Sequence, residues 1–193
     1  QKVLNQINAD VLDQAERWTE LLSLYPDSVK PVSDFGLPKW LPEEVSSFSQ
    51  IEELADLMRA EWSLGTNPIQ SVVDTLESKG VMIICTDVES KKKFDGLAGT
   101  IDTTPIIVLS AHQAGDRQRF TLAHELGHLV LAGRLIESLD EEKACNMFAS
   151  AFLLPTTAIV EHMGQHRTAI EAQELYMLKQ EFGISMMAIL WRL

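Results

Sequence analysis

Two histidines four residues apart, His124 and His128, are the side chains whose type and spacing most clearly allow chemistry. Residues four apart on an α-helix lie on one face, one above the other, so both imidazoles can reach a single metal ion. Glu125 follows His124 directly and projects about 100° further round the helix, beside such an ion rather than on it. The pattern therefore predicts a metal-bound water with a carboxylate placed to take its proton.

The pentapeptide from His124 to His128 reads H-E-x-x-H, and zinc is the metal that its donors favour. Catalytic zinc sites use three protein ligands and leave one position for water. The metal lowers the pKa of that water to about 7, and a neighbouring glutamate acts as general base. We therefore expect Glu125 to be the catalytic base. The sequence does not distinguish zinc from manganese.

The third ligand has to come from another segment, and a helix predicted over residues 141–154 offers two glutamates. Ser138 and Glu141 have the S-x-x-E spacing of a capping box, which gives Glu141 a structural role at the helix N-terminus. Glu142 shares a face with small and apolar residues, where a carboxylate is costly to bury unless it is paired or bound to a cation. We therefore favour Glu142 over Glu141 as the third ligand.

The elements that would position these residues predict an α+β fold. Apolar residues at helical spacing predict further helices over residues 2–24, 47–62 and 69–78. Apolar runs predict strands over residues 81–85, 94–101 and 104–109. We expect these strands to form a small antiparallel sheet packed on the metal helix. Residues 104–110 are the best candidate for an open edge that accepts an extended peptide, and an internal, purely structural strand is the alternative.

Composition limits the classes of protein that fit. Of the 193 residues, 46% are hydrophobic, enough for a proper core, and the net charge of −12 argues against broad electrostatic capture of nucleic acid. The two cysteines give no disulfide framework and fit a reducing cytosol. No membrane-spanning run or signal peptide is visible, so we expect a cytoplasmic protein. Because the chain starts at Gln1, we expect a fragment of a longer protein.

The chain divides, by prediction, into a helical connector and strap over residues 1–46 and a catalytic domain over residues 47–193. Prolines and a glycine between residues 26 and 46 predict the extended strap. Residues 168–193 predict two helices about Gly183 that contain few basic side chains, so they are not expected to read DNA. The sequence does not indicate the oligomeric state.

Six stretches together resemble the ImmA/IrrE family of zinc metallopeptidases, and the likeness covers about residues 50–193. The stretches are residues 64–69, 94–96, 117–128, 142–149, 153–155 and 182–193. The resemblance implies a minimal zincin-like peptidase, with His124, His128 and Glu142 as ligands and Glu125 as base. Cys145 departs from the family pattern, which usually has alanine there. A thiolate binds zinc well, but a small buried hydrophobic role is expected for Cys145.

The resemblance also implies a role. Members of the family are bacterial regulatory proteases that cleave or inactivate a helix-turn-helix repressor encoded nearby. Many carry their own N-terminal helix-turn-helix domain, and the helix over residues 2–24 resembles the connector that follows it. Any contact with nucleic acid would then be made by a part of the protein before Gln1. The expected function is a zinc endopeptidase that regulates transcription in a stress response. The alternative is a zinc-stabilised module that sequesters a partner without cleavage.

Some further side chains have an expected role that the sequence does not settle. A peptidase needs an electrophile for the developing oxyanion. The candidates are His112, His162, His166 and Tyr176, which the sequence does not rank. Arg117 and Arg119, at the start of the metal helix, are expected to have acidic partners, with a role in binding a substrate carboxylate as the alternative.

Overall fold

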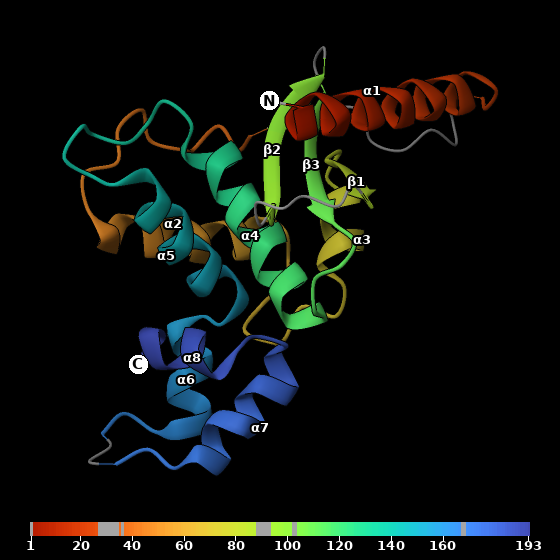
Figure 1. Cartoon of the computed structure of the whole chain (residues 1–193). Coiled ribbons are helices and arrows are strands. Elements are labelled where there is room, and N and C mark those ends of the chain that lie inside the picture. Colours follow the sequence, from red (N-terminus) through yellow and green to blue (C-terminus); the bar gives the residue numbers. More distant parts are fainter. Residues whose placement is uncertain (1, 27–34, 36, 88–93, 102–103, 167–168) are drawn as a thin grey trace. The chain divides into compact units, whose positions relative to one another are not determined.

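The computed structural model describes residues 2–26, 35, 37–87, 94–101, 104–166 and 169–193 (Figure 1). Two compact units make up the chain: Gln1–Gly36 with Val73–Gln113, here the sheet unit, and Leu37–Val72 with Ala114–Leu193, here the helical unit. The predicted division at residue 46 remains a prediction, because these units interleave along the chain. Residues 27–34 and 36 of the predicted strap lie outside the described residues. The α+β class is confirmed.

The sheet unit combines one long helix with three strands. The elements are α1 (Lys2–Ser23), β1 (Met82–Thr86), β2 (Gly96–Ile101) and β3 (Thr104–Ser110). The strand order is β1-β3-β2, with β1 parallel and β2 antiparallel to β3. Figure 1 shows α1, in red, lying across the strands. Val11 and Ala15 of α1 share a core cluster with Ile84, Ile106 and Val108, so burial of one apolar face holds the helix on the sheet.

Two predictions for this sheet are wrong. The sheet is mixed rather than antiparallel, because Met82 of β1 pairs with Ile106 of β3 in the parallel sense. Strand β3 lies between β1 and β2, so residues 104–110 are not an edge and have no side open to an incoming peptide. The residues from Pro105 to Leu109 are all buried. A continuous apolar run of this kind is typical of an internal strand, whereas a half-exposed edge strand alternates. The predicted packing of the sheet on the metal helix remains a prediction.

The helical unit is built around α5. Its helices are α2 (Phe48–Glu61), α4 (Gly115–Leu131), α5 (Glu141–Leu153), α6 (Thr156–Met163), α7 (Ala172–Phe182) and α8 (Met186–Arg192). The short α3 (Val72–Glu77) is shorter than the helix predicted over residues 69–78. Helix α5 packs against both α2 and α4, and Phe148 and Phe152 of α5 are fully buried. Figure 1 shows α4 in green beside α5 in teal.

A glycine allows α4 and α5 to approach closely. A Cβ atom added at Gly127 of α4 would lie 3.2 Å from Cα of Cys145 and 3.3 Å from its Cβ. Few real Cβ contacts are that short, so a side chain at residue 127 would push the two helices apart. Because Gly127 lies between the two histidines in the sequence, the close approach occurs where α4 and α5 have to share a site.

Two arginine side chains fix other parts of the helical unit. Arg59 of α2 is 2% exposed and donates to the carbonyl oxygens of Gly65 at 2.8 Å, Asn67 at 2.6 Å and Phe152 at 2.5 Å. Arg119 of α4 donates to the carbonyl oxygens of Ile69 at 2.6 Å, Gln70 at 3.2 Å and Phe182 at 3.2 Å. The predicted acidic partner of Arg119 is therefore wrong: the guanidinium satisfies backbone acceptors at a loop and at the end of α7.

Residues 37–46 of the strap are part of the helical unit and are attached to it. Leu41 and Val45 are buried, and Val45 forms an isolated parallel bridge with Leu135. Arg134 donates to the carbonyl oxygen of Pro42 at 2.8 Å. Within the described residues, no single helix has the length and apolar character to cross a membrane, although α5 and α6 together, bent by 52°, meet those two requirements.

Candidate metal centre

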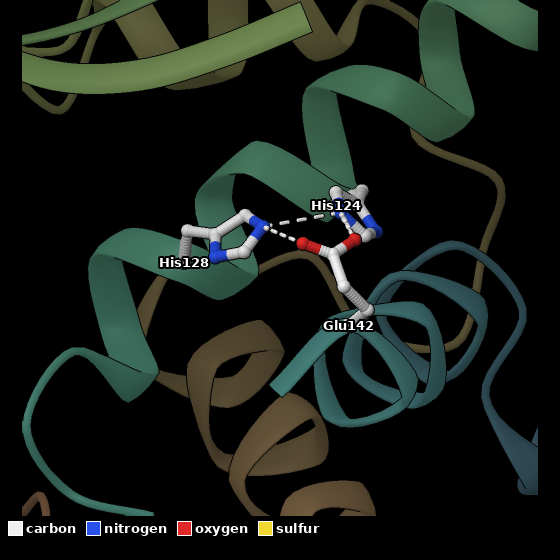
Figure 2. Close-up of side chains that lie close together, drawn as sticks. All are labelled: His124, His128 and Glu142. Carbon is white, nitrogen blue, oxygen red and sulfur yellow. Dashed lines mark hydrogen bonds and ion pairs between the residues drawn. The ribbon is translucent and has the colours of Figure 1, made fainter. Parts of the chain in front are cut away.

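Three side chains from two helices meet at one point in the helical unit. Helix α4 supplies His124 and His128, and the first turn of α5 supplies Glu142 (Figure 2). One ligand atom from each lies within 4.8 Å of the other two. The two Nε2 atoms are 3.2 Å apart, and Glu142 approaches His124 Nε2 at 3.3 Å and His128 Nε2 at 3.5 Å. The predicted convergence of these three residues is thus present in the structure.

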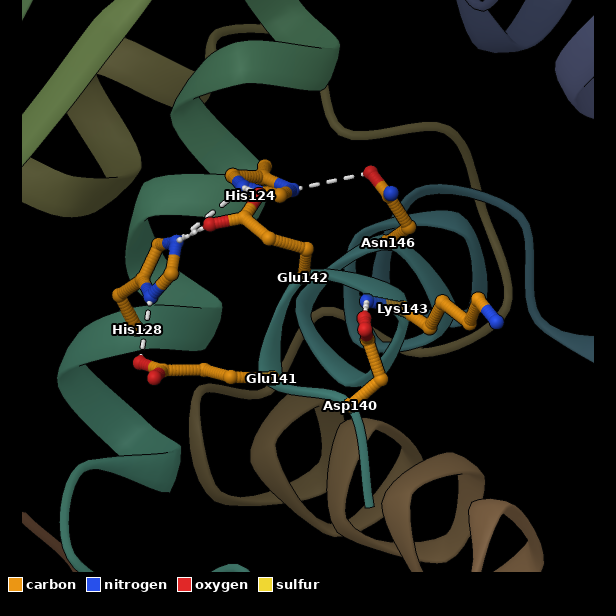
Figure 3. Close-up of polar contacts among 7 residues, drawn as sticks. All are labelled: His124, His128, Asp140, Glu141, Glu142, Lys143 and Asn146. Atoms are coloured by element: carbon orange, nitrogen blue, oxygen red, sulfur yellow. Dashed lines mark hydrogen bonds and ion pairs between the residues drawn. The ribbon is translucent and has the colours of Figure 1, made fainter.

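The far side of each imidazole has its own partner (Figure 3). His128 Nδ1 lies 3.0 Å from Oε1 of Glu141, and His124 Nδ1 lies 3.0 Å from Oδ1 of Asn146. A carboxylate and an amide oxygen are acceptors only, so each Nδ1 must carry the proton and donate it. In the neutral rings both Nε2 atoms are then unprotonated and face the shared point with their lone pairs, as metal-ligating histidines do.

The electrostatics of this arrangement favour a cation. Burial lowers the pKa of His124, and positive charge on His128 would lower it further, so the neutral imidazole is favoured. Two unprotonated nitrogens and the carboxylate of Glu142 are three acceptors that face one another with no proton between them. Such a set is repulsive unless a positive ion lies between its members. These residues therefore fit a bound metal ion.

The structure gives Glu141 a different role from the one predicted. The N-cap of α5 is Asp140, whose side chain accepts from the backbone nitrogen of Lys143 at 2.8 Å. A capping box with Ser138 would need the helix to begin three residues before Glu141, but α5 begins at Glu141 itself. The capping-box prediction is therefore wrong, and the Glu141 carboxylate is available to orient His128. Figure 3 shows Glu141 turned toward that imidazole.

Glu142 lies in the cluster for a different reason from the one that favoured it. Its side chain is 71% exposed rather than buried on an apolar stripe. It reaches the histidines because α5 begins beside α4, so the first turn of α5 presents its carboxylates to the metal helix. An exposed ligand on one side and buried helices on the other leave the centre open to solvent in one direction.

Glu125 and Cys145 lie beside the cluster rather than in it. Glu125 is only 6% exposed and is not among the three clustered residues. Burial raises the pKa of the Cys145 thiol to about 12, and the charges of Glu141, Glu142 and Glu125 raise it in the same direction. Cys145 is fully buried and is not among the clustered residues, which agrees with the structural role expected for it. The assignment of Glu125 as catalytic base remains a prediction.

The four candidate electrophiles, His112, His162, His166 and Tyr176, remain predictions. The ring of His162 is engaged elsewhere, with the carbonyl oxygen of Ala158 at 2.7 Å and with Glu181. Asn146 and Glu141 are the residues that sequence reasoning missed. The four-residue step from Glu142 to Asn146, matching the step between the histidines, was the available signal.

The family follows from a comparison of sequences. Residues 76–193, more than half of the chain, match the sequence profile of the IrrE N-terminal-like domain. The chain belongs to this family. The resemblance to the ImmA/IrrE family is thereby confirmed.

Individual relatives of this IrrE-like chain match parts of their own length. The radiation response metalloprotease IrrE of Deinococcus radiodurans is 35% identical over 69 residues, which cover 29% of this chain and 21% of that protein. A Mycobacterium tuberculosis transcriptional regulator of known structure is similar with a TM-score of 0.50 and 15% identity, over 74% of this chain and 46% of that one. The second similarity is one of fold alone. This chain spans about a fifth of the first relative and under half of the second.

Proposed function

We propose that this IrrE-like chain is a zinc-dependent endopeptidase whose ligands are His124, His128 and Glu142. The observation that carries the proposal is the convergence of the two imidazoles and the carboxylate. Zinc binds nitrogen and oxygen at about 2.0–2.1 Å with tetrahedral geometry, which puts neighbouring ligand atoms about 3.3–3.4 Å apart. In the cluster the two Nε2 atoms are 3.2 Å apart, Oε2 of Glu142 lies 3.3 Å from Nε2 of His124, and Oε1 of Glu142 lies 3.5 Å from Nε2 of His128. Each of these contacts is close to the separation of two ligands of one zinc ion, and three protein ligands would leave a fourth position for water.

The residues around the centre have different roles in the proposed reaction. Bound zinc would supply an acidic water and polarise the carbonyl of the scissile peptide. Glu125 takes the proton from the attacking water and delivers it to the amine of the leaving peptide. Asn146 and Glu141 hold the two imidazoles in the tautomer that presents Nε2 to the metal. Glu142, which is largely exposed, completes the ligand set on the side open to substrate.

The proposed substrate is a helix-turn-helix repressor protein, whose cleavage would regulate transcription in a stress response. Support for this finer statement comes from the family resemblance, from a relative that is a radiation response metalloprotease, and from a fold shared with a transcriptional regulator. A cytoplasmic location is proposed with it, since a repressor has to be met beside the chromosome.

The test mixes the zinc-loaded protein with the repressor encoded next to it and follows intact masses. Wild type should cut the repressor, whereas Glu125→Gln should bind zinc normally and cut about 10²–10⁴-fold more slowly. The control is Glu137→Gln, which changes an exposed glutamate outside the cluster and should cut at the wild-type rate. Undiminished cleavage by Glu125→Gln would refute the assigned base. Stoichiometric binding of intact repressor by wild type would overturn the peptidase in favour of the sequestering module.

A further inference from the structure

The helical unit contains an apolar cavity of about 550 Å³. Its apolar lining comes from four helices and consists of Phe48, Phe120, Met147, Ala188 and Trp191. Pockets that hold small ligands typically have volumes of about 300–1,000 Å³ and walls that are mostly apolar or aromatic. The cavity therefore has the size and chemistry of a binding pocket rather than of a packing defect.

The cavity adjoins the metal cluster through shared residues. Asn146 lines the cavity, and its Oδ1 atom lies 3.0 Å from Nδ1 of His124. Phe120, also in the lining, precedes His124 by one helical turn on the same face of α4. Figure 3 shows Asn146 beside His124, at the end of the cluster away from His128. The cavity therefore begins one side chain away from the metal cluster, next to His124.

The walls of the cavity are fixed in place by polar contacts. Arg192 of α8 donates to Oε1 of Glu52 at 2.5 Å and to the carbonyl oxygen of Leu154 at 3.2 Å. These contacts tie α8, which carries Ala188 and Trp191, to α2 and to the end of α5. Trp191 is 86% exposed, so its indole stands where the lining meets solvent. A pocket whose walls are held before binding loses little entropy when it is filled.

We propose that this cavity seats a large apolar side chain of the polypeptide substrate, next to the bond that is cut; this rests on the proposed peptidase function. An extended peptide advances about 3.3 Å per residue, so a side chain within one or two residues of the scissile bond reaches a pocket beside His124. Acidic side chains are disfavoured nearby because Glu141 and Glu142 lie at the cluster. Lys143 also lines the cavity, but it points away from the two histidines (Figure 3).

Direct binding tests the pocket without any need for cleavage. Met147 lies in the lining, so its methyl signal in zinc-loaded protein with ¹³C-methyl methionine reports occupancy. N-acetyl-leucinamide and N-acetyl-phenylalaninamide should shift that signal at concentrations at least about tenfold lower than N-acetyl-alaninamide needs. One methylene group in an apolar pocket already changes the preference between two ligands about 10–200-fold. Absence of any response at Met147 to the leucine and phenylalanine probes would overturn the proposal.

Three variants sharpen the binding test. Ala188→Phe narrows the cavity from α8 and should weaken the response of Met147. Met187→Phe makes a comparable change one residue away, at a side chain that is 62% exposed and outside the lining, and should bind as wild type does. Trp191→Ala removes a largely exposed side chain, so it should leave the fold intact while weakening the response. Equal responses of all three variants and wild type would contradict the proposal.

Cleavage profiles separate this inference from the peptidase proposal. Unfolded β-casein is digested by zinc-loaded wild type, Ala188→Phe and Met187→Phe, and the cut bonds are mapped by mass spectrometry. Wild type and Met187→Phe should cut beside leucine, phenylalanine or methionine, whereas Ala188→Phe should shift the cuts to alanine, glycine or serine. Identical profiles for all three would overturn the pocket and leave the peptidase intact. Probe binding at Met147 without any cleavage would support an apolar site and count against the peptidase.

Discussion

Two sets of convergent acceptors in the helical unit differ in where their cation comes from. Around Arg59, three backbone carbonyl oxygens lie within 2.8 Å of a guanidinium that belongs to the chain. At the metal centre, His124, His128 and Glu142 point three acceptor atoms at one another, and none of the three contributes a donor. The first set is complete when the chain folds. The second needs a cation from solution, which is the property expected of a functional site.

Exposure separates the two sets in the same way. Arg59 is 2% exposed, and burial lowers its pKa to about 10, which still leaves it charged at neutral pH. The side chains of His124, His128 and Glu142 are 15%, 24% and 71% exposed. Helix α5 takes part in both, with Phe152 near its end bound to Arg59 and Glu142 in its first turn at the metal centre. One end of α5 is therefore fixed in the core while the other presents ligands.

The largest effect is expected on stability, from removing the guanidinium of Arg59. Arg59→Met should lower the free energy of unfolding by about 3 kcal/mol or more, because three hydrogen bonds from a charged group are lost, each contributing about 1.5–3 kcal/mol. Urea denaturation measures this, and the loss should be the same with or without a chelator. Arg17→Met, which removes an exposed pair with Asp13, is the control and should cost less than about 1 kcal/mol. A loss at residue 59 as small as that of the control would show that the carbonyls do not depend on Arg59.

Removing an acceptor from the metal centre should have little effect on the free energy of unfolding and a large effect on zinc affinity. Glu142→Ala should lower zinc affinity by more than about 100-fold, since even residues that only orient ligands contribute about 10–100-fold. Competition with a chromophoric chelator measures the affinity, and urea denaturation of the metal-free protein should differ little from wild type. Unchanged zinc affinity would remove Glu142 from the ligand set and return Glu141 or Cys145 as the third ligand.

A smaller effect should distinguish Glu141 from its neighbour Asp140. Glu141→Ala should weaken zinc binding about 10–100-fold, because His128 loses the acceptor that fixes its tautomer. Asp140→Ala removes the N-cap of α5 and should instead cost about 0.5–2 kcal/mol of stability with zinc affinity nearly unchanged. The paired measurement is chelator competition and urea denaturation on both variants. The reverse pattern would restore Glu141 to the capping role that its sequence spacing suggests.

The smallest effect is one of pH on the metal-free protein. Burial lowers the pKa of His124, so above pH about 6.5 the imidazole is neutral in both folded and unfolded chains and contributes no pH dependence. Below that pH the unfolded chain takes up the proton first. The free energy of unfolding should therefore decrease as the pH is lowered, by at most about 1.4 kcal/mol per pH unit. His124→Gln should lose this component, whereas Arg59 stays charged throughout and adds none. An unchanged slope in the variant would contradict the assignment to His124.

Local patterns predicted the helices of the metal centre, and non-local contacts decided what was missed. The spacing of His124 and His128 is a property of one helix, so the sequence alone sufficed to place them. The role of Glu141 depended on where α5 begins, and a shift of the N-cap from Ser138 to Asp140 turned a structural carboxylate into a ligand-orienting one. The parallel pairing of β1 with β3 joins strands distant in sequence, which apolar runs do not encode.

The most direct test is the zinc content and zinc X-ray absorption spectrum of the protein as isolated. One zinc ion per chain is predicted, bound at about 2.0–2.1 Å by two imidazole nitrogens, a carboxylate oxygen and a water oxygen. A protein that takes up no zinc at stoichiometric concentration, or whose spectrum shows sulfur at about 2.3 Å from Cys145, would contradict it.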